Sequence, residues 1–305
     1  MPLTHTADLA LPTTAAPGLR ARIGAFIELT KPGIVRMVLI TGGAGFFMGS
    51  NGFLRFVPLL WTLLGMGLAA AGACALNEFV ERERDRLMCR TASRPLPTGR
   101  LGTGESLLYG LALTAGGVAV LAWRSTLPAT VLVAATVVLY VAVYTPLKRL
   151  HWTATLVGAV PGALPIVAGW AAAGAPLDTR ALALFGILYA WQMPHFFALA
   201  WMHRQDYRRG GFHMISERDA TGHRTARHIV VWALALVATS TLPTVTGISG
   251  TPYAATALLL GAVFLALALA ALRAPSDARA LRVFLASVTY LPVLLFVMVL
   301  EKLLA

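Results

Sequence analysis

Residues 57–85 read VPLLWTLLGMGLAAAGACALNEFVERERD, and this stretch decides which kind of fold the chain can adopt. Residues 57–77 contain no charged side chain, whereas residues 78–85 carry acids and arginines. An apolar run of about 20 residues is long enough to cross the hydrocarbon core of a bilayer as a helix. The stretch therefore predicts a membrane-spanning helix, near residues 57–78, that is followed by a polar segment.

The rest of the chain has the composition of a membrane protein. Of its 305 residues, 57% are hydrophobic and 12% are charged, whereas soluble domains carry about 25% charged residues. Long runs rich in Ala, Leu and Val favour helices over the alternating pattern of barrel strands. We therefore expect an all-α membrane protein with about nine transmembrane helices. The predicted spans lie near 35–50, 57–78, 104–123, 128–146, 153–173, 180–201, 228–248, 252–272 and 283–303.

The basic residues predict how this bundle is oriented. The net charge is +12, and nine spans would place all but four of the 25 Lys and Arg residues on the same side. The four exceptions are Arg55, Arg124, Arg180 and Lys302. Because Lys and Arg gather in cytoplasmic loops, we predict a cytoplasmic N-terminus and a C-terminus on the outer face. Membrane orientation explains the positive charge without a nucleic-acid partner.

The chain divides into two parts of unequal size. Residues 1–22 are rich in Thr, Ala and Pro and lack the apolar core of a signal peptide, so they predict a disordered cytoplasmic tail. Residues 23–305 are predicted to form a single transmembrane domain.

Polar side chains at the end of the second span predict a metal–diphosphate site. Asn77, Glu81 and Asp85 are spaced four residues apart, so a continuous helix would carry all three on one face. Their oxygens suit Mg²⁺, which is usually held by a few carboxylates together with substrate phosphates. Arg90 and Arg94 follow and can bind phosphate oxygens in bidentate fashion. The competing interpretation is a solvated loop whose arginines only follow the positive-inside pattern.

Two other segments carry candidate site residues. The sixth run contains WQMPH, residues 191–195, and a His inside a span is a functional candidate by default. His195 could also serve only a hydrogen bond between helices. Asp206, just beyond this run, could join the first cluster around one metal–diphosphate unit. In residues 144–149, YTPLKR, Lys148 either faces the diphosphate or belongs to a simple short loop, and the sequence favours neither.

These three clusters together resemble the protohaem IX farnesyltransferases (haem O synthases), a branch of the UbiA-type membrane-embedded prenyltransferases. The similarity extends from LTKP, residues 29–32, to the last span. It is carried by NEFVERERDRLMCRTASRPL at 77–96, YTPLKR at 144–149, GAVPGALPIVAGW at 158–170, WQMPHF at 191–196 and DYRRGG at 206–211.

The resemblance implies a fold and a reaction. The helices would surround a central cavity that is open to the cytoplasmic side. Farnesyl diphosphate would be the donor, haem b the acceptor and Mg²⁺ the cofactor, giving haem O for terminal oxidase assembly. The enzyme would lie among the lipids of a bacterial cytoplasmic (inner) membrane, with haem A synthase or terminal oxidase assembly factors as partners.

The resemblance also implies residue roles, with catalysis assigned to Asn77, Glu81, Asp85, Lys148 and Asp206. Of these, Asn77, Glu81, Asp85 and Asp206 would hold the metal. Diphosphate binding falls to Arg90, Arg94, Lys148 and Arg149. The haem side falls to Tyr144, Trp191 and His195.

The chain departs from the family pattern at two places, and two alternative functions stay open. The chain has Glu81 where the family has Asp, and HMIS at residues 213–216 where the family reads Pro-Met-Leu-Pro. One alternative is a prenyltransferase for a quinone or chlorophyll precursor, against which the haem-type motifs argue. The other is a catalytically weakened membrane protein that binds haem or assists its assembly, and Glu81 motivates it.

Overall fold

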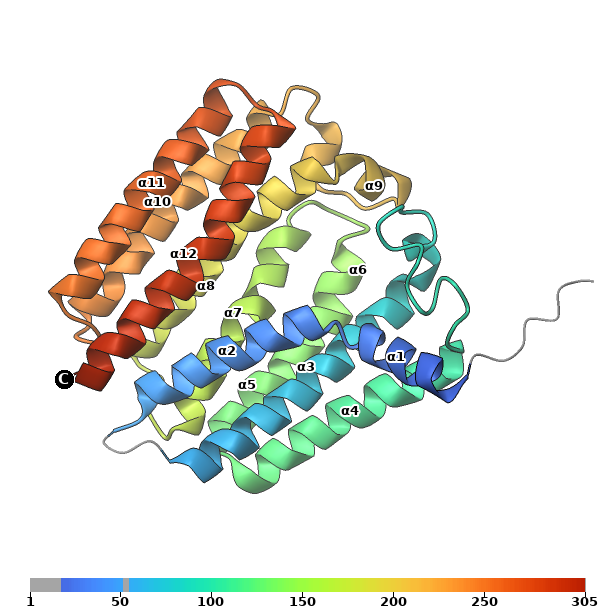
Figure 1. Ribbon diagram of the computed structural model, residues 1–305, viewed down its shortest axis with the longest axis horizontal. Helices are drawn as coiled ribbons and strands as arrows, with labels where there is room; N and C mark the ends of the chain where they lie inside the picture. Colours follow the sequence, from blue (N-terminus) through green and yellow to red (C-terminus); the bar gives the residue numbers. More distant parts are fainter. Residues whose placement is uncertain (1–17, 52–54, 305) are drawn as a thin grey trace, which may run out of the picture.

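The computed structural model describes residues 18–51 and 55–304, and every regular element in these ranges is a helix (Figure 1). The elements are α1 (Leu19–Leu29), α2 (Pro32–Gly49), α3 (Phe56–Asp85), α4 (Thr103–Arg124), α5 (Leu127–Val138), η1 (Leu139–Tyr144), α6 (Thr145–Leu147), α7 (Ala154–Ala172), α8 (Thr179–Met202), α9 (Arg204–Arg209), η2 (Ile215–Arg218), α10 (His223–Val245), α11 (Thr251–Arg273) and α12 (Asp277–Leu304).

Nine helical segments in the described part of the chain are long and apolar enough to cross a membrane. They confirm the all-α fold class and the number of spans. The largest shift is in α3, which runs on to Asp85 instead of ending near residue 78. Glu and Arg are good helix formers, so the polar segment continues the helix. The turn η1 and helix α6 prolong α5, and the three form one span, Leu127–Leu147.

The predicted tail, residues 1–22, lies outside the described residues except at its end. There Leu19 opens α1, whose exposed apolar side chains include Ile23 and Ile27. Helix α1 ends at Leu29, and α2 starts directly afterwards with a proline, a residue that suits the first helical position. Lys31 lies at this junction with φ of 52°, an uncommon backbone conformation for a residue with a side chain.

The helices form two packed groups. Helices α2, α3, α4, α5 and α7 make one group, and α8, α10, α11 and α12 make the other, with α7 against α8 between them (Figure 1). Loop 86–102 and segment 203–222 meet at the same end of the bundle, where the Arg84 guanidinium donates to the carbonyls of Gly210 and Gly211 at 2.7 and 2.8 Å. We call this the polar end. At the opposite end, Lys302 donates to the carbonyl of Phe47 at 2.9 Å.

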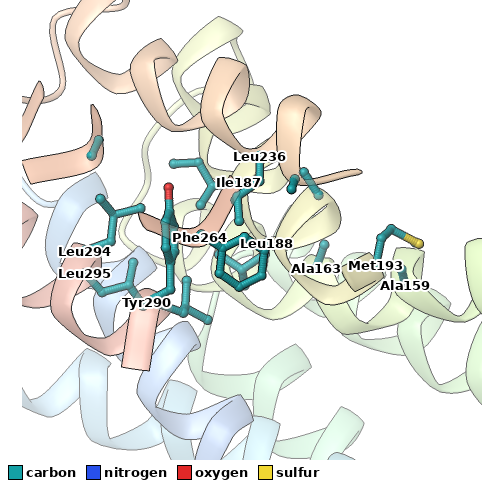
Figure 2. Packing of buried hydrophobic residues seen from close by; sticks show 14 of the residues in the cluster. Ala159, Ala163, Ile187, Leu188, Met193, Leu236, Phe264, Tyr290, Leu294 and Leu295 are labelled. Atoms are coloured by element: carbon teal, nitrogen blue, oxygen red, sulfur yellow. The ribbon is translucent and has the colours of Figure 1, made fainter. Parts of the chain in front are cut away.

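The second group has a large apolar core. Figure 2 shows Tyr290 and Phe264 among Leu and Ile side chains, and their rings meet edge to face with centroids 5.8 Å apart. The Tyr290 hydroxyl and the Ser240 hydroxyl are hydrogen-bonded at 2.8 Å, so the one polar group of that ring is satisfied. Aromatic pairs of this kind add about 0.5–1.5 kcal/mol beyond area burial. This packing fixes α12 against α10 and α11, and thereby sets the position of the α12 face that meets α8.

Helices α2 and α7 cross at unusually short range. A Cβ added to Gly45 would lie 1.9 Å from the carbonyl oxygen of Ile166, and one added to Gly169 would lie 1.9 Å from that of Gly42. Small residues allow such close approach in membrane bundles, where helix association relies on van der Waals packing.

Substituting Gly45 by Ala is expected to push α2 away from α7. Overpacking of this kind costs about 1–3 kcal/mol, so the variant should unfold at a lower temperature in detergent. Gly43→Ala is the matched control, because its added Cβ would meet only Leu63 at 3.8 Å. Equal unfolding temperatures for the two variants would contradict the crossing described here.

Candidate active site

The last three turns of α3 bury four polar side chains on one face. Asn77, Glu78, Glu81 and Asp85 are 2%, 2%, 4% and 1% exposed, whereas Glu83 on another face is exposed. Asn77, Glu81 and Asp85 thus share a face, as their spacing predicts. A buried carboxylate is costly unless it is paired with a cation or a hydrogen-bond donor. The surrounding segments therefore have to supply positive charge.

Three cations from three segments meet these carboxylates. Lys148, which follows α6, forms an ion pair with Glu81. Arg94 of loop 86–102 contacts Asp85 at 2.7 Å, and its Nε lies 3.5 Å from Glu78. Each contact joins α3 to a segment that carries a predicted diphosphate-binding residue.

Lys31 is the third cation, and it enters the cluster from the junction of α1 and α2. Its Nζ donates to Asn77 Oδ1 at 2.6 Å and lies 3.8 Å from Glu78. The Asn77 amide nitrogen in turn donates to the Thr145 hydroxyl at 3.0 Å. Asn77 therefore links α3 to both α2 and α6.

The surroundings shift the pKa values of Lys148 and Lys31 in opposite directions. Burial alone would lower the pKa of Lys148, but the adjacent Glu81 carboxylate outweighs it and holds this pKa above its ordinary value. Burial, reinforced by the nearby Arg94 guanidinium, lowers the pKa of Lys31. Lys148 is thus fixed as a cation at neutral pH.

Two carboxylate oxygens of the cluster have no donor. Glu78 Oε2 and Asp85 Oδ1 are buried and accept no hydrogen bond from the described residues. Such oxygens fit Mg²⁺, a hard cation that takes oxygen ligands. No three His, Cys, Asp or Glu side chains in residues 18–51 and 55–304 are grouped so that they could hold a metal alone. Mg²⁺ is commonly held by one or two carboxylates together with substrate phosphates.

Other predicted residues lie nearby but have different partners. Asp206 of α9 accepts hydrogen bonds from the backbone amides of Cys89 and Arg90, both at 3.2 Å. The Arg90 side chain is exposed. Arg149 donates to the backbone carbonyl of Val80 at 2.7 Å. The structure therefore does not bring Asp206, Arg90 or Arg149 to the buried carboxylates, and their assigned roles stay predictions.

An apolar cavity of about 390 Å³ begins beside this cluster. Its wall includes Cys74 of α3, one turn before Glu78, and Gly33 near the start of α2. From there it follows α3 to Met66. Almost all of the lining is aliphatic or aromatic, so the cavity suits a hydrocarbon chain whose charged end stays at the cluster.

A π-helical turn connects the cavity to the charged cluster. Tyr140 and Tyr144 of η1 line the cavity and stack with ring centroids 5.5 Å apart. Lys148 Nζ lies 4.9 Å from the centroid of Tyr144. Single π-helical turns often occur at functional sites. This turn places Tyr144, a predicted haem-side residue, between the cavity and the cation.

The other two predicted haem-side residues also line the cavity. Trp191 and His195 come from α8, and their rings stack with centroids 5.3 Å apart. The structure thus brings Tyr144, Trp191 and His195 to one cavity, although they come from two different spans.

Sequence reasoning missed Lys31 and Glu78. Glu78 lies seven residues before Asp85, a spacing that puts both on one helix face, and this signal was available. The sequence indicated Lys31 less clearly, because a lysine directly before Pro32 is expected to lie in a loop and face solvent. Only the fold shows that its Nζ turns inward to Asn77.

Comparisons with known proteins identify the family of the chain. The UbiA prenyltransferase family matches residues 38–294. A protoheme IX farnesyltransferase from Solibacter usitatus is 42% identical over 286 residues, covering 91% of this chain and 98% of that protein. A protoheme IX farnesyltransferase from Koribacter versatilis is 38% identical over 309 residues, covering 97% and 98%.

The fold has a counterpart among solved structures as well. A UbiA homolog from Archaeoglobus fulgidus, bound to GPP and Mg²⁺, superposes with a TM-score of 0.67 at 16% identity and covers 90% of this chain and 99% of its own. At that identity the likeness concerns the fold alone. With the family matched over residues 38–294 and close sequence relatives over nearly the full length, the chain belongs to the UbiA prenyltransferase family.

Proposed function

We propose that this chain transfers a farnesyl group from farnesyl diphosphate to a vinyl group of haem b, giving haem O for terminal oxidase assembly. The observation that carries the proposal is the cluster of buried carboxylates and cations beside an apolar cavity. The relatives named protoheme IX farnesyltransferase support haem b as the acceptor.

The charged cluster would bind the diphosphate as a metal complex. Bound Mg²⁺ would offset the negative charge that grows on the diphosphate as the carbon–oxygen bond breaks. Glu78 and Asp85 would hold it through their free oxygens, together with Asn77 and Glu81. Each carboxylate now faces a protein cation, so these cations would be available to the phosphate oxygens once the carboxylates turn to the metal.

Lys148 and Arg94 would then neutralise the leaving group, with Lys31 beside them. The cavity would hold the farnesyl chain and exclude most water from the allylic cation. The faces of Tyr140 and Tyr144 would stabilise that cation, because aromatic faces attract positive charge. Water supplies the hydroxyl of the product, so the acceptor side has to admit it after the new carbon–carbon bond forms.

The acceptor is tested with the purified protein in lipid nanodiscs. Given Mg²⁺, farnesyl diphosphate and haem b, it is expected to yield a more hydrophobic haem that has gained the mass of one farnesyl group and one hydroxyl group. An aromatic quinone precursor in place of haem should give no prenylated product. Prenylation of the quinone precursor alone would favour the first alternative, and haem binding without any product would favour the haem-binding alternative.

Asp206 provides a separate prediction. Because it accepts two backbone hydrogen bonds from loop 86–102, Asp206→Asn is expected to loosen that loop and raise the KM for farnesyl diphosphate about tenfold. The Mg²⁺ concentration for half-maximal activity should stay unchanged. A large rise in that concentration would instead support the assignment of Asp206 as a metal ligand.

The proposal includes a location and an orientation. A single transmembrane domain, residues 23–305, would lie in a bacterial inner membrane with the polar end and the cavity opening on the cytoplasmic side. The N-terminus would then be cytoplasmic and the C-terminus on the outer face, with haem A synthase or oxidase assembly factors receiving the product. The distribution of Lys and Arg supports this orientation.

Cys89 makes the orientation measurable. It is exposed at the polar end, whereas Cys74, the other cysteine, is buried. In right-side-out vesicles a membrane-impermeant thiol reagent should leave Cys89 unlabelled, and in inverted vesicles it should label it. Thr251→Cys in a Cys89→Ser background, exposed at the opposite end, should give the reverse pattern. Labelling of Cys89 in right-side-out vesicles would contradict the orientation.

A further inference from the structure

One residue of α12 holds two side chains of the cavity wall. Ser287 is fully buried and faces α8. Its backbone carbonyl accepts a hydrogen bond from Trp191 Nε1 at 2.6 Å. Its hydroxyl lies 2.8 Å from His195 Nδ1. Trp191 and His195 are therefore both fixed by the same point on the neighbouring helix.

The hydrogen bonds of the Ser287 hydroxyl determine which His195 nitrogen carries the proton. A serine hydroxyl has one hydrogen to donate and lone pairs to accept with. Here it donates to the backbone carbonyl of Phe284 at 2.5 Å. Toward His195 it can then only accept. The imidazole must donate from Nδ1, and in the neutral ring this leaves Nε2 with an unprotonated lone pair.

The Nε2 lone pair is left without a donor beside the cavity. His195 lines the cavity, and none of the described residues makes a hydrogen bond to Nε2. The ring lies between aromatic neighbours, with centroids 5.3 Å from Trp191 and 4.7 Å from Phe284. A lone pair in such surroundings can take a metal without bringing a charge of its own.

A neutral imidazole nitrogen is the commonest protein ligand of metals, and it is the proximal ligand of many haem irons. A ligating His almost always donates its other ring N–H to an acceptor, which fixes the tautomer and the ring orientation. The Ser287 hydroxyl is such an acceptor. The arrangement thus has the two groups that a metal-ligating histidine needs. They are the free Nε2 of His195 on α8 and the Ser287 hydroxyl on α12, which accepts the hydrogen bond from Nδ1.

We propose that Ser287 is a positioning residue that keeps His195 in the Nδ1–H tautomer, so that Nε2 ligates the iron of the haem acceptor. The inference rests on the proposed function in one respect, since it takes an iron porphyrin as the acceptor. Ligation would hold the porphyrin in the same cavity that Tyr144 lines next to Lys148. Trp191, tied to the Ser287 carbonyl, would limit how far the imidazole can turn.

The test is a titration of the purified full-length protein with ferric haem b, without farnesyl diphosphate, followed by absorption and resonance Raman spectroscopy. The wild type is expected to show an iron–histidine signature. His195→Ala should lose it, and added imidazole should restore it. Ser287→Ala should weaken haem binding about 10- to 100-fold, and Ser287→Thr, which keeps a hydroxyl, should restore most of the affinity.

Ser240→Ala is the matched control. It removes another fully buried hydroxyl next to α12, one that contacts Tyr290 and does not line the cavity, so haem binding should not change. If His195→Ala is poorly folded, the two Ser287 variants still decide the matter. The inference is overturned if wild-type haem shows no histidine ligation, or if Ser287→Ala binds haem as the wild type does.

The haem-binding test and the test of farnesyl transfer can fail independently of each other. Haem O formation by a wild type without histidine-ligated iron would overturn the ligand and leave farnesyl transfer intact. Histidine-ligated haem without any haem O would overturn farnesyl transfer and leave His195 as the iron ligand.

Discussion

Asp85→Asn is expected to lower the rate of farnesyl transfer by about 100- to 1,000-fold, comparable to the loss of one preorganised charge-stabilising group in other enzymes. Asp85 is 1% exposed, and its Oδ2 is held by Arg94 at 2.7 Å while Oδ1 has no donor. The amide keeps the shape of the side chain but loses the negative charge that would attract Mg²⁺. The Mg²⁺ concentration for half-maximal activity should therefore rise along with the loss in kcat.

Glu83→Gln is the matched control for Asp85→Asn. It removes an acid from the same helix, but Glu83 is exposed and pairs with Arg86 at 2.9 Å. Its activity and Mg²⁺ dependence should match the wild type. The Mg²⁺ dependence is measured by initial rates over a Mg²⁺ series after treatment with a chelator. If Asp85→Asn and the wild type show the same dependence, Asp85 is not a metal ligand.

Lys148→Met is the second change with a large expected effect, again about 100- to 1,000-fold in kcat. The substitution removes a cation that would receive the leaving diphosphate, and it leaves the buried Glu81 carboxylate without its partner. Breaking a buried ion pair in this way also costs about 3–5 kcal/mol of stability. The variant should thus show a lower unfolding temperature as well as a slower reaction.

Two further variants separate these effects. Lys148→Arg keeps the charge and should recover part of the activity. The double variant Lys148→Met/Glu81→Gln removes the unpaired charge, so it should regain stability, but its turnover should stay low because it lacks both the cation and the Glu81 carboxylate assigned to the metal. Recovery of turnover in the double variant would mean that Lys148 serves only to pair Glu81, and that the diphosphate is neutralised elsewhere.

Much of the fold could be predicted because lipid imposes a simple rule on sequence. Each span needs a long apolar run, and the few Lys and Arg residues mark which loops share a side. Lys302 illustrates the second point, since it reaches the carbonyl of Phe47 at the end opposite the Arg-rich loops. The continuation of α3 to Asp85 went beyond the predicted span, although the spacing of Asn77, Glu81 and Asp85 indicated that a continuous helix would put all three on one face.

The partners of the site residues could not be predicted, because they depend on contacts between segments far apart in the chain. Arg94 and Arg90 look alike in the sequence, yet only Arg94 reaches the buried carboxylates. Asp206, predicted as a further acid for the metal, accepts hydrogen bonds from the backbone of loop 86–102, a contact that the sequence did not indicate. Ser287 carries no signal at all, since a serine in an apolar span usually bonds only to its own helix.

Glu81, the main departure from the family pattern, also has a structural account. Its carboxylate reaches Lys148, which is held at the end of α6, so the longer side chain still ends within the cluster. The weakened-enzyme alternative therefore receives no support from the position of this residue. The departure at residues 213–216 lies around η2, where the Ser216 hydroxyl donates to the carbonyl of Ala200 at 2.8 Å and attaches the segment to α8.

The most direct test of the account is the stoichiometry of the reaction in nanodiscs, measured as haem O formed and diphosphate released from the same samples. We expect one haem O for each diphosphate, with both products abolished by a metal chelator, restored by Mg²⁺ and strongly reduced in Asp85→Asn. Haem O that forms at an undiminished rate in the chelated enzyme or in Asp85→Asn would contradict it, as would diphosphate release that no farnesylated haem accompanies.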